Sequence, residues 1–250
     1  MEPANVSPLL QQQLSQLSSG FGTFWHRVRS KLVTSVINSL GITGVVDIGA
    51  GSGTLGKYLR SYCPNVQYRF QEPIKELADA LEAEIGFGTN VPYAEKYRDN
   101  ESLVLLDVIE HIQEPSTFLD DLTRKLNPGN FMILTVPAGN YLFSAWDVNL
   151  GHYRRYSRSG LLELASNKGL LIIECTYIFP ELLIPAIFRR MRGKSASQST
   201  KAEFPNLPKF IDKGLEIIGN TTSRLRRYSP LGTSLLIVLQ KPMLEPQSHE

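Results

Sequence analysis

The sequence predicts an α/β fold with a doubly wound, mostly parallel sheet. Its central feature is a short apolar run over residues 45–48 that contains one acid and leads into glycines at positions 49, 51 and 53. A buried parallel strand, a tight turn and a helix start produce this pattern. Further apolar runs over 66–72 and 102–107 each end at an acid, and helical patterns separate them. This alternation is typical of parallel strands joined by helices.

Composition and length set limits on what the protein can be. A chain of 250 residues suits one large α/β domain with additions, and a net charge of +2 is too small to argue for nucleic-acid binding. Cys63 and Cys175 have no metal-type spacing and form no disulfide framework. No apolar run is long enough to span a membrane, and residues 1–20 lack the apolar core of a signal peptide. We therefore expect a cytoplasmic protein.

The first half of the chain follows the predicted alternation. Residues 1–20 are expected to be a flexible tail, and apolar residues at helical spacing predict a helix over 21–40. Beyond the glycine turn we expect a helix over 54–63, a strand over 66–71 and a helix over 73–84, with Pro73 in its first turn. A third strand should follow between residues 85 and 100, but no acidic strand end is visible there.

In the second half, an insertion interrupts the pattern. Strands are expected over 102–107, 131–136, 170–177 and 233–240, and helices over 115–126 and 157–168, with Ser157 as the cap and Gly169 as the stop of the latter. Between the last two strands, residues 179–232 form an insertion with an amphipathic basic helix over 208–228. Residues 242–250 are expected to be a second flexible tail.

The glycine turn fits two kinds of cofactor. Gly51, Gly53 and Gly56 match the dinucleotide fingerprint, and Glu72 follows at the distance of a ribose-binding acid, so an NAD-dependent oxidoreductase stays open. Asp47 is the discriminating residue, because a nicotinamide-binding strand has no use for a charge there. The pattern from Asp47 through Gly49, Gly51 and Gly53 resembles motif I of class I S-adenosylmethionine-dependent methyltransferases.

The resemblance implies a seven-stranded Rossmann-like methyltransferase fold over residues 21–241, with an N-terminal helix and an antiparallel last strand. The helical insertion before that strand is a departure, because the family has a short turn there. It implies S-adenosylmethionine as the cofactor, with Asp47 helping to hold the amino group and Glu72 on the ribose hydroxyls. The residues assigned to the cofactor on this basis are Asp47, Gly49, Ala50, Gly51, Gly53, Leu55, Glu72, Pro73, Asp107 and Val108.

Two later segments carry the candidate catalytic and acceptor residues. The run from Asp107 to His111, with the helix and turn after it, is similar to ubiquinone-type O-methyltransferases, and the run over 151–156 resembles a bacterial branch of type 11 methyltransferases. Both runs follow neighbouring strands of this fold, so they should face one cleft. We assign catalysis to His111, His152 and Asp147, because imidazole titrates near neutral pH. Acceptor binding is assigned to Trp25, Tyr153, Arg154, Arg155 and Tyr156.

Each of these assignments has an alternative. Trp25 could pack the first helix onto the sheet, and one arginine could pair with Asp147 and only shape the loop. Asp107, Glu110, His111 and His152 are similar to the set that holds a divalent cation in small-RNA 2′-O-methyltransferases, although that family has a glutamate where this chain has Asp107. Because Glu-His at this point is widespread in metal-independent methyltransferases, a metal is not favoured.

The predicted reaction is O-methylation of a polar small-molecule, sugar-linked or lipid-linked acceptor. Carboxyl or N-methylation, metal-assisted sugar or RNA 2′-O-methylation, and a catalytically silent cofactor-binding protein remain alternatives. No basic and aromatic segment beyond 151–156 extends into a nucleic-acid surface, so we expect no nucleic-acid partner. The insertion is interpreted as an acceptor lid, as a dimer surface in a monomeric or homodimeric protein, or as a peripheral membrane contact.

Overall fold

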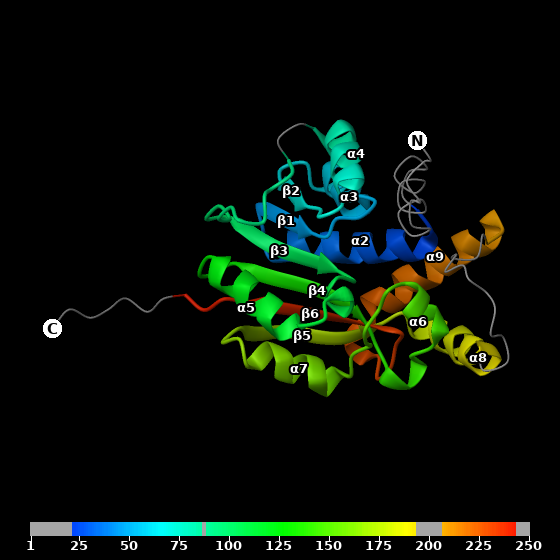
Figure 1. The fold of residues 1–250 in the computed structure, drawn as a ribbon. Helices are drawn as coiled ribbons and strands as arrows, with labels where there is room; N and C mark the ends of the chain where they lie inside the picture. Colours follow the sequence, from blue (N-terminus) through cyan, green and yellow to red (C-terminus); the bar gives the residue numbers. More distant parts are fainter. Residues whose placement is uncertain (1–21, 87–88, 194–206, 244–250) are drawn as a thin grey trace, which may run out of the picture.

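The computed structural model describes residues 22–86, 89–193 and 207–243 (Figure 1). Over these ranges one sheet of six strands has the order β2-β1-β3-β4-β6-β5. β6 pairs antiparallel with β4 and β5, and the other pairs are parallel, as predicted. The strands are β1 (Gly44–Ile48), β2 (Gln67–Gln71), β3 (Glu101–Leu106), β4 (Phe131–Pro137), β5 (Leu171–Ile178) and β6 (Ser234–Gln240). The tail predicted at 1–20, and residues 244–250 of the tail predicted at 242–250, lie outside the described residues.

Helices cover both faces of this sheet (Figure 1). They are α2 (Phe24–Ser39), α3 (Thr54–Tyr62), α4 (Lys75–Ile85), α5 (Pro115–Lys125), α6 (Ala145–Asn149), α7 (Arg158–Ser166), α8 (Leu183–Gly193) and α9 (Lys209–Arg224). Side chains alternate across each strand, so the two faces build separate cores. Val46 and Leu103 pack with α5 and α7, whereas Val45 and Val104 pack with α2 and α3. Both faces are therefore buried, as the apolar strand runs predict.

The predicted seventh strand is absent from the described residues, and this corrects the expected strand count. Phe70 makes one isolated parallel bridge, in which its N–H donates to Thr89 O at 2.9 Å and its carbonyl accepts from Val91 N–H at 2.7 Å. The chain then turns immediately, with the Glu95 N–H donating to Pro92 O at 2.9 Å. The edge pairing stops after one residue because the turn takes the chain away from β2 before further bonds can form.

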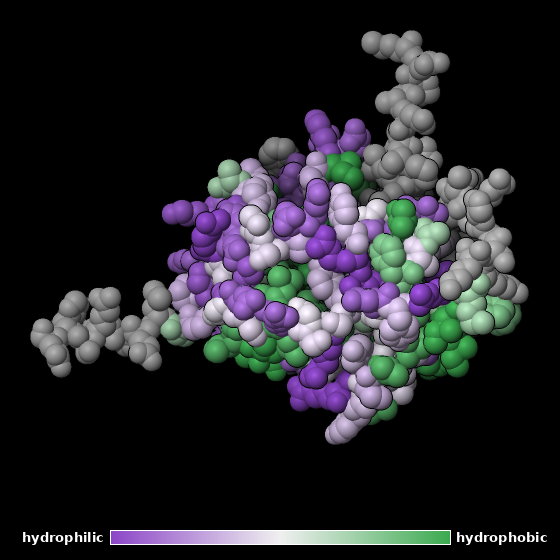
Figure 2. Space-filling model, turned by 60° about the horizontal axis from the view of Figure 1, so that its bottom comes forward, coloured by the Kyte–Doolittle hydropathy of each residue, from purple (hydrophilic) through white to green (hydrophobic). Residues whose placement is uncertain are grey.

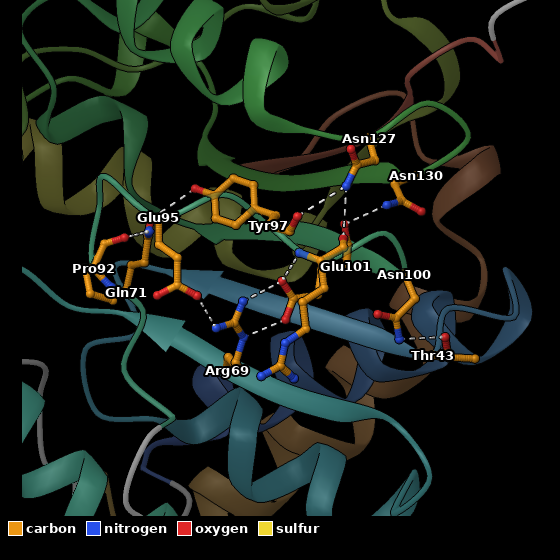
Figure 3. A network of polar contacts seen from close by, with 11 residues as sticks. Thr43, Arg69, Gln71, Pro92, Glu95, Tyr97, Asn100, Glu101, Asn127 and Asn130 are labelled. Atoms are coloured by element: carbon orange, nitrogen blue, oxygen red, sulfur yellow. Dashed lines mark hydrogen bonds and ion pairs between the residues drawn. The ribbon is translucent and has the colours of Figure 1, made fainter.

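A buried ion-pair network holds this irregular segment against the sheet instead (Figure 3). Arg69 of β2 donates from Nε to Glu101 Oε1 at 2.6 Å and from Nη2 to Oε2 at 2.8 Å, a two-pronged contact with the first residue of β3. Its third nitrogen donates to Glu95 at 2.9 Å. The Tyr97 hydroxyl also donates to the Gln71 side chain at 3.2 Å. Side-chain contacts from Glu95 and Tyr97 therefore hold this segment to β2, where strand pairing was expected.

The insertion folds back onto the N-terminal helix. It contains the short helices η3 (Pro180–Leu182) and η4 (Arg226–Tyr228) besides α8 and α9. Arg27 of α2 pairs with Asp212 and with Glu216 of α9, and the Phe24 N–H donates to Asp212 at 3.0 Å. Arg226 pairs with Glu174 of β5 at 2.5 Å. Among the described residues, none of the helices combines the length and the apolar character needed to cross a bilayer.

We expect Glu101→Gln to lower the free energy of unfolding by about 3 kcal/mol, because it leaves the Arg69 charge in a buried position without its main partner. The Glu101 side chain is fully buried, whereas that of Glu95 is 46% exposed. Glu95→Gln is therefore the matched control and should cost under about 1 kcal/mol. Urea unfolding measures both, and equal losses would show that the buried contact has no special weight.

Candidate active site

The glycine turn lies at the carboxyl end of β1 and has a left-handed backbone at each of its three glycines. Gly49, Gly51 and Gly53 have φ values of 69°, 55° and 66°, a region that side-chain-bearing residues rarely adopt. Gly53 is also the N-cap of α3, and a Cβ on it would lie 2.3 Å from a methyl of Leu81. The turn therefore has both the backbone conformation and the close packing that require glycine.

Two acids flank this turn. Asp47 is buried at the end of β1 and accepts a hydrogen bond from the Tyr68 hydroxyl at 2.8 Å. Burial raises the pKa of Asp47 to about 7, and this effect exceeds the opposing contributions of Tyr68 and Arg29. Glu72 follows β2, where one of its oxygens accepts the Gly51 N–H at 2.8 Å. Its other oxygen accepts the Ile74 N–H at 3.0 Å, so Glu72 ties the turn to the start of α4.

The remaining residues assigned to the cofactor surround the same edge. Val108 lies under the turn, since a Cβ on Gly49 would be 3.1 Å from its side chain. Ala50 packs against the small apolar cluster around Phe70, and Pro73 precedes α4. Leu55 instead has its side chain in the core beneath α2 and α3. The structure thus brings together the residues from three strand ends, with Leu55 in a packing position.

Sequence reasoning missed Arg29, which reaches this edge from α2. Its guanidinium pairs with Asp107 and lies 4.6 Å from the Trp25 ring centroid. Asp107 has a left-handed φ of 56° and accepts from the Thr135 hydroxyl at 3.2 Å. A left-handed non-glycine residue is strained and is frequent at functional sites. Arg29 follows the predicted acceptor residue Trp25 by one turn of the same helix, and this spacing indicates that the two side chains share a face.

Asp147 is the centre of the second predicted cluster. It is fully buried in α6 and accepts from Arg155 Nε at 2.7 Å and from the Ser144 N–H at 3.0 Å. His152 Nδ1 lies 3.2 Å from Oδ1, the same oxygen that accepts from Arg155. Burial opposes ionisation, but the His152 hydrogen bond and the Arg155 charge hold the pKa of Asp147 below its ordinary value. Arg155 is therefore the arginine that pairs with Asp147, as the alternative interpretation of the loop expects.

The two histidines meet, as predicted. The rings of His111 and His152 lie 4.7 Å apart, centroid to centroid, at 83° to one another. An ionised Asp147 can only accept, so in a neutral His152 the proton is on Nδ1 and the lone pair is on Nε2. Burial, and then the neighbouring His152, lower the pKa of His111. The lowered pKa keeps the His111 ring neutral, which is the form that can accept a proton.

Glu110 completes this cluster as a buried acid. Neither of its carboxylate oxygens has a hydrogen-bond partner in the described structure, and burial raises its pKa well above the ordinary value. Glu110, His111 and His152 each offer one ligand atom within 4.8 Å of the others. Asp107 is outside this group and pairs with Arg29 instead. Of the four predicted metal residues, the structure brings three together.

The predicted acceptor residues divide by environment. Tyr153 is exposed, and Arg154 donates to Gln113 O at 2.7 Å beside it. Tyr156 is buried, and its hydroxyl donates to Ile109 O at 3.1 Å, which gives it a structural role. Trp25 is half-buried against the core around α2, 6.0 Å from the Phe179 ring and under Arg29. Trp25 thus has the packing contacts of the alternative interpretation, whereas Tyr153 and Arg154 keep accessible positions.

We expect Gly53→Ala to destabilise the protein more than Gly41→Ala, although both glycines have left-handed φ values of 66° and 65°. A Cβ at Gly41 meets nothing within 4 Å, so it adds only backbone strain of about 1–2 kcal/mol. At Gly53 the clash with Leu81 should add about 1–3 kcal/mol. Urea unfolding of both variants tests this, and equal losses would contradict the close packing of the turn.

Comparisons with known proteins support the fold. The sequence matches no protein-family model and no curated protein. Among solved structures, one similar chain is a Galdieria sulphuraria protein provisionally named a sarcosine dimethylglycine methyltransferase, with a TM-score of 0.58, 12% identity, and 87% of this chain and 86% of that chain covered.

Two further structures cover almost the whole of both chains. The [4+2]-cyclase SpnF has a TM-score of 0.55 and 14% identity, with 94% of this chain and 93% of that chain covered. The plantazolicin methyltransferase BpumL, solved with S-adenosylhomocysteine (SAH), has a TM-score of 0.51 and 13% identity, with 94% and 95% covered. With its parallel strands, antiparallel β6 and glycine turn, this chain therefore has the Rossmann-like fold of class I methyltransferases.

Proposed function

We propose that this protein is an S-adenosylmethionine-dependent methyltransferase that methylates an oxygen of a polar acceptor. The observation that carries the proposal is the left-handed glycine turn between the buried Asp47 and the bonded Glu72. Gly49 and Gly53 leave no room for a side chain, and the helix start of α3 lies directly beyond them. The helix start suits the carboxylate of a methionine part, and the two acids suit its ammonium group and a ribose diol.

When bound, the cofactor supplies an electrophilic methyl group, so the protein must position the acceptor and remove its proton. Asp147 orients His152 through Nδ1 and leaves Nε2 to take the proton from an acceptor hydroxyl. His111 lies against the His152 ring and lines the same site. Tyr153 and Arg154, on the loop beside them, are placed to contact a polar or anionic acceptor.

Cofactor choice can be tested by pH-dependent binding. We expect S-adenosylmethionine to bind and NAD not to bind in calorimetry. Because Asp47 has a pKa raised to about 7, it is mostly protonated below that pH and gains its charge above it. Affinity for the cationic cofactor should therefore rise roughly tenfold from about pH 6 to about pH 8.

Asp47→Asn is the matched control, because the amide keeps the shape and the Tyr68 contact but cannot ionise. Its affinity should be weaker and nearly independent of pH. An unchanged pH dependence in this variant would exclude Asp47 as the group responsible. Binding of NAD in preference to S-adenosylmethionine would overturn the methyltransferase proposal. This test is needed because a similar fold also occurs in the cyclase SpnF.

We expect His152→Ala to lower turnover by about 100-fold or more, because it removes the general base. Affinity for S-adenosylmethionine should stay within about twofold of the original, since the base does not touch the cofactor turn. Release of SAH measures turnover, first with a panel of phenols, sugars, carboxylic acids and amines to find an acceptor. Equal losses of turnover and cofactor affinity would contradict the assignment of His152 to the acceptor side.

A metal-assisted form of the same reaction is the second candidate, favoured by the Glu110, His111 and His152 cluster. Carboxylate and imidazole are ordinary ligands of divalent cations. Dialysis against EDTA, followed by the same turnover assay, separates the two forms. Activity that survives unchanged supports proton removal by His152 alone, and loss that Mn²⁺ or Zn²⁺ restores supports the metal.

A further inference from the structure

Helix α8, in the insertion, leaves an apolar stripe exposed. Ile184, Ile187, Phe188 and Met191 stand at helical spacing on one face, and their side chains are 81%, 43%, 53% and 69% exposed. Figure 2 shows apolar surface on the right of the molecule, over the position of α8 in Figure 1. Exposed apolar residues that gather in one patch indicate an interaction surface.

A basic side chain borders this stripe. Arg190 is half-buried beside Ile187 and Met191, and it forms no salt bridge within the described structure. An apolar helix face bordered by an arginine matches an anionic bilayer, where the apolar side chains enter the acyl boundary and the guanidinium group meets the phosphates.

The stripe continues into a groove that begins at the active-site edge. A groove of about 550 Å³ is lined by Tyr141, Leu142, Ile187, Arg190 and Met191. Tyr141 and Leu142 belong to η2 (Asn140–Leu142), which directly follows β4. The groove thus joins the outer face of α8 to the carboxyl end of the strand that precedes the catalytic loop.

A direct contact joins α8 to the catalytic loop. The Arg189 guanidinium lies 4.5 Å from the centroid of the Trp146 ring in α6. The next residue, Asp147, orients His152. Arg189 therefore links the helix that lines the groove to the segment that orients the proposed base.

We propose that α8 docks the protein on an anionic lipid bilayer, and that the groove beneath α8 receives an amphiphile resident in that bilayer. The polar head of the amphiphile lies toward His152, and its apolar part lies between η2 and α8. The identification of this amphiphile as the methyl acceptor rests on the proposed function. The proposal that α8 docks on the bilayer rests only on the apolar stripe, Arg190 and the groove.

The test is sedimentation of the full chain with vesicles, without any turnover. Vesicles of phosphatidylglycerol mixed equally with phosphatidylcholine should bind the protein, and vesicles of phosphatidylcholine alone should bind it at least tenfold more weakly. Replacing Ile184 and Met191 together by Asp should weaken binding to the mixed vesicles at least tenfold, because both side chains lie on the docking face.

Ile173→Asp is the matched control. Ile173 is also an exposed apolar residue, 48% against 81% for Ile184 and 69% for Met191, but it lies on β5 outside the patch and should leave vesicle binding unchanged. A retained melting temperature shows that each variant is folded. No vesicle binding by the original protein, equal binding to both vesicle types, or an equal loss in the Ile173 variant would each overturn docking by α8.

Size-exclusion chromatography with light scattering completes the test. A dimer that the Ile184 and Met191 substitutions convert to a monomer, with no vesicle binding by the original protein, would assign the stripe to a contact between copies and overturn the proposal. SAH binding is measured on the same samples. Vesicle binding without SAH binding would leave docking supported and remove the proposed function, so the two failures are distinguishable.

Discussion

The site depends on the parallel alignment of β1, β3 and β4, which forces their carboxyl ends to meet at one edge of the sheet. The chain passes from β1 to β2 on one side and then crosses to β3 on the other side of β1, so this edge is a topological switch point. The glycine turn, the strained Asp107 and the loop with His152 follow these three strands. The fold therefore brings together residues that are about a hundred positions apart in sequence, although no local sequence pattern indicates that they meet.

Helix α2 connects this edge to the insertion. Arg29 pairs with Asp107 at the end of β3, and Arg27, two residues earlier, pairs with Asp212 and Glu216 of α9. The N-terminal helix is thus held by the strand ends on one side and by α9 on the other. A shift of α9 would therefore move α2, and with it Arg29, at the edge where the cofactor is proposed to bind.

Three buried acids near this edge have different protonation tendencies, and their surroundings explain the difference. Asp147 is surrounded by donors and keeps its pKa low, whereas Glu110 has no bonded partner and its pKa is well above the ordinary value. Asp47 is intermediate, with a pKa of about 7. Such separation of acids by environment is typical of sites that bind charged ligands and move protons.

The sequence alone determined the alternation of strands and helices, the glycine turn and the two clusters around His111 and His152, because these rest on local periodicity and on residues that only one backbone conformation accommodates. It also placed the antiparallel β6 and the insertion. Tertiary structure decided the rest. The segment expected to form the edge strand is bound to β2 by the Arg69–Glu95 pair, Arg29 reaches Asp107 from α2, and Arg155 pairs with Asp147. Each depends on the meeting of distant charged groups, which no sequence spacing specifies.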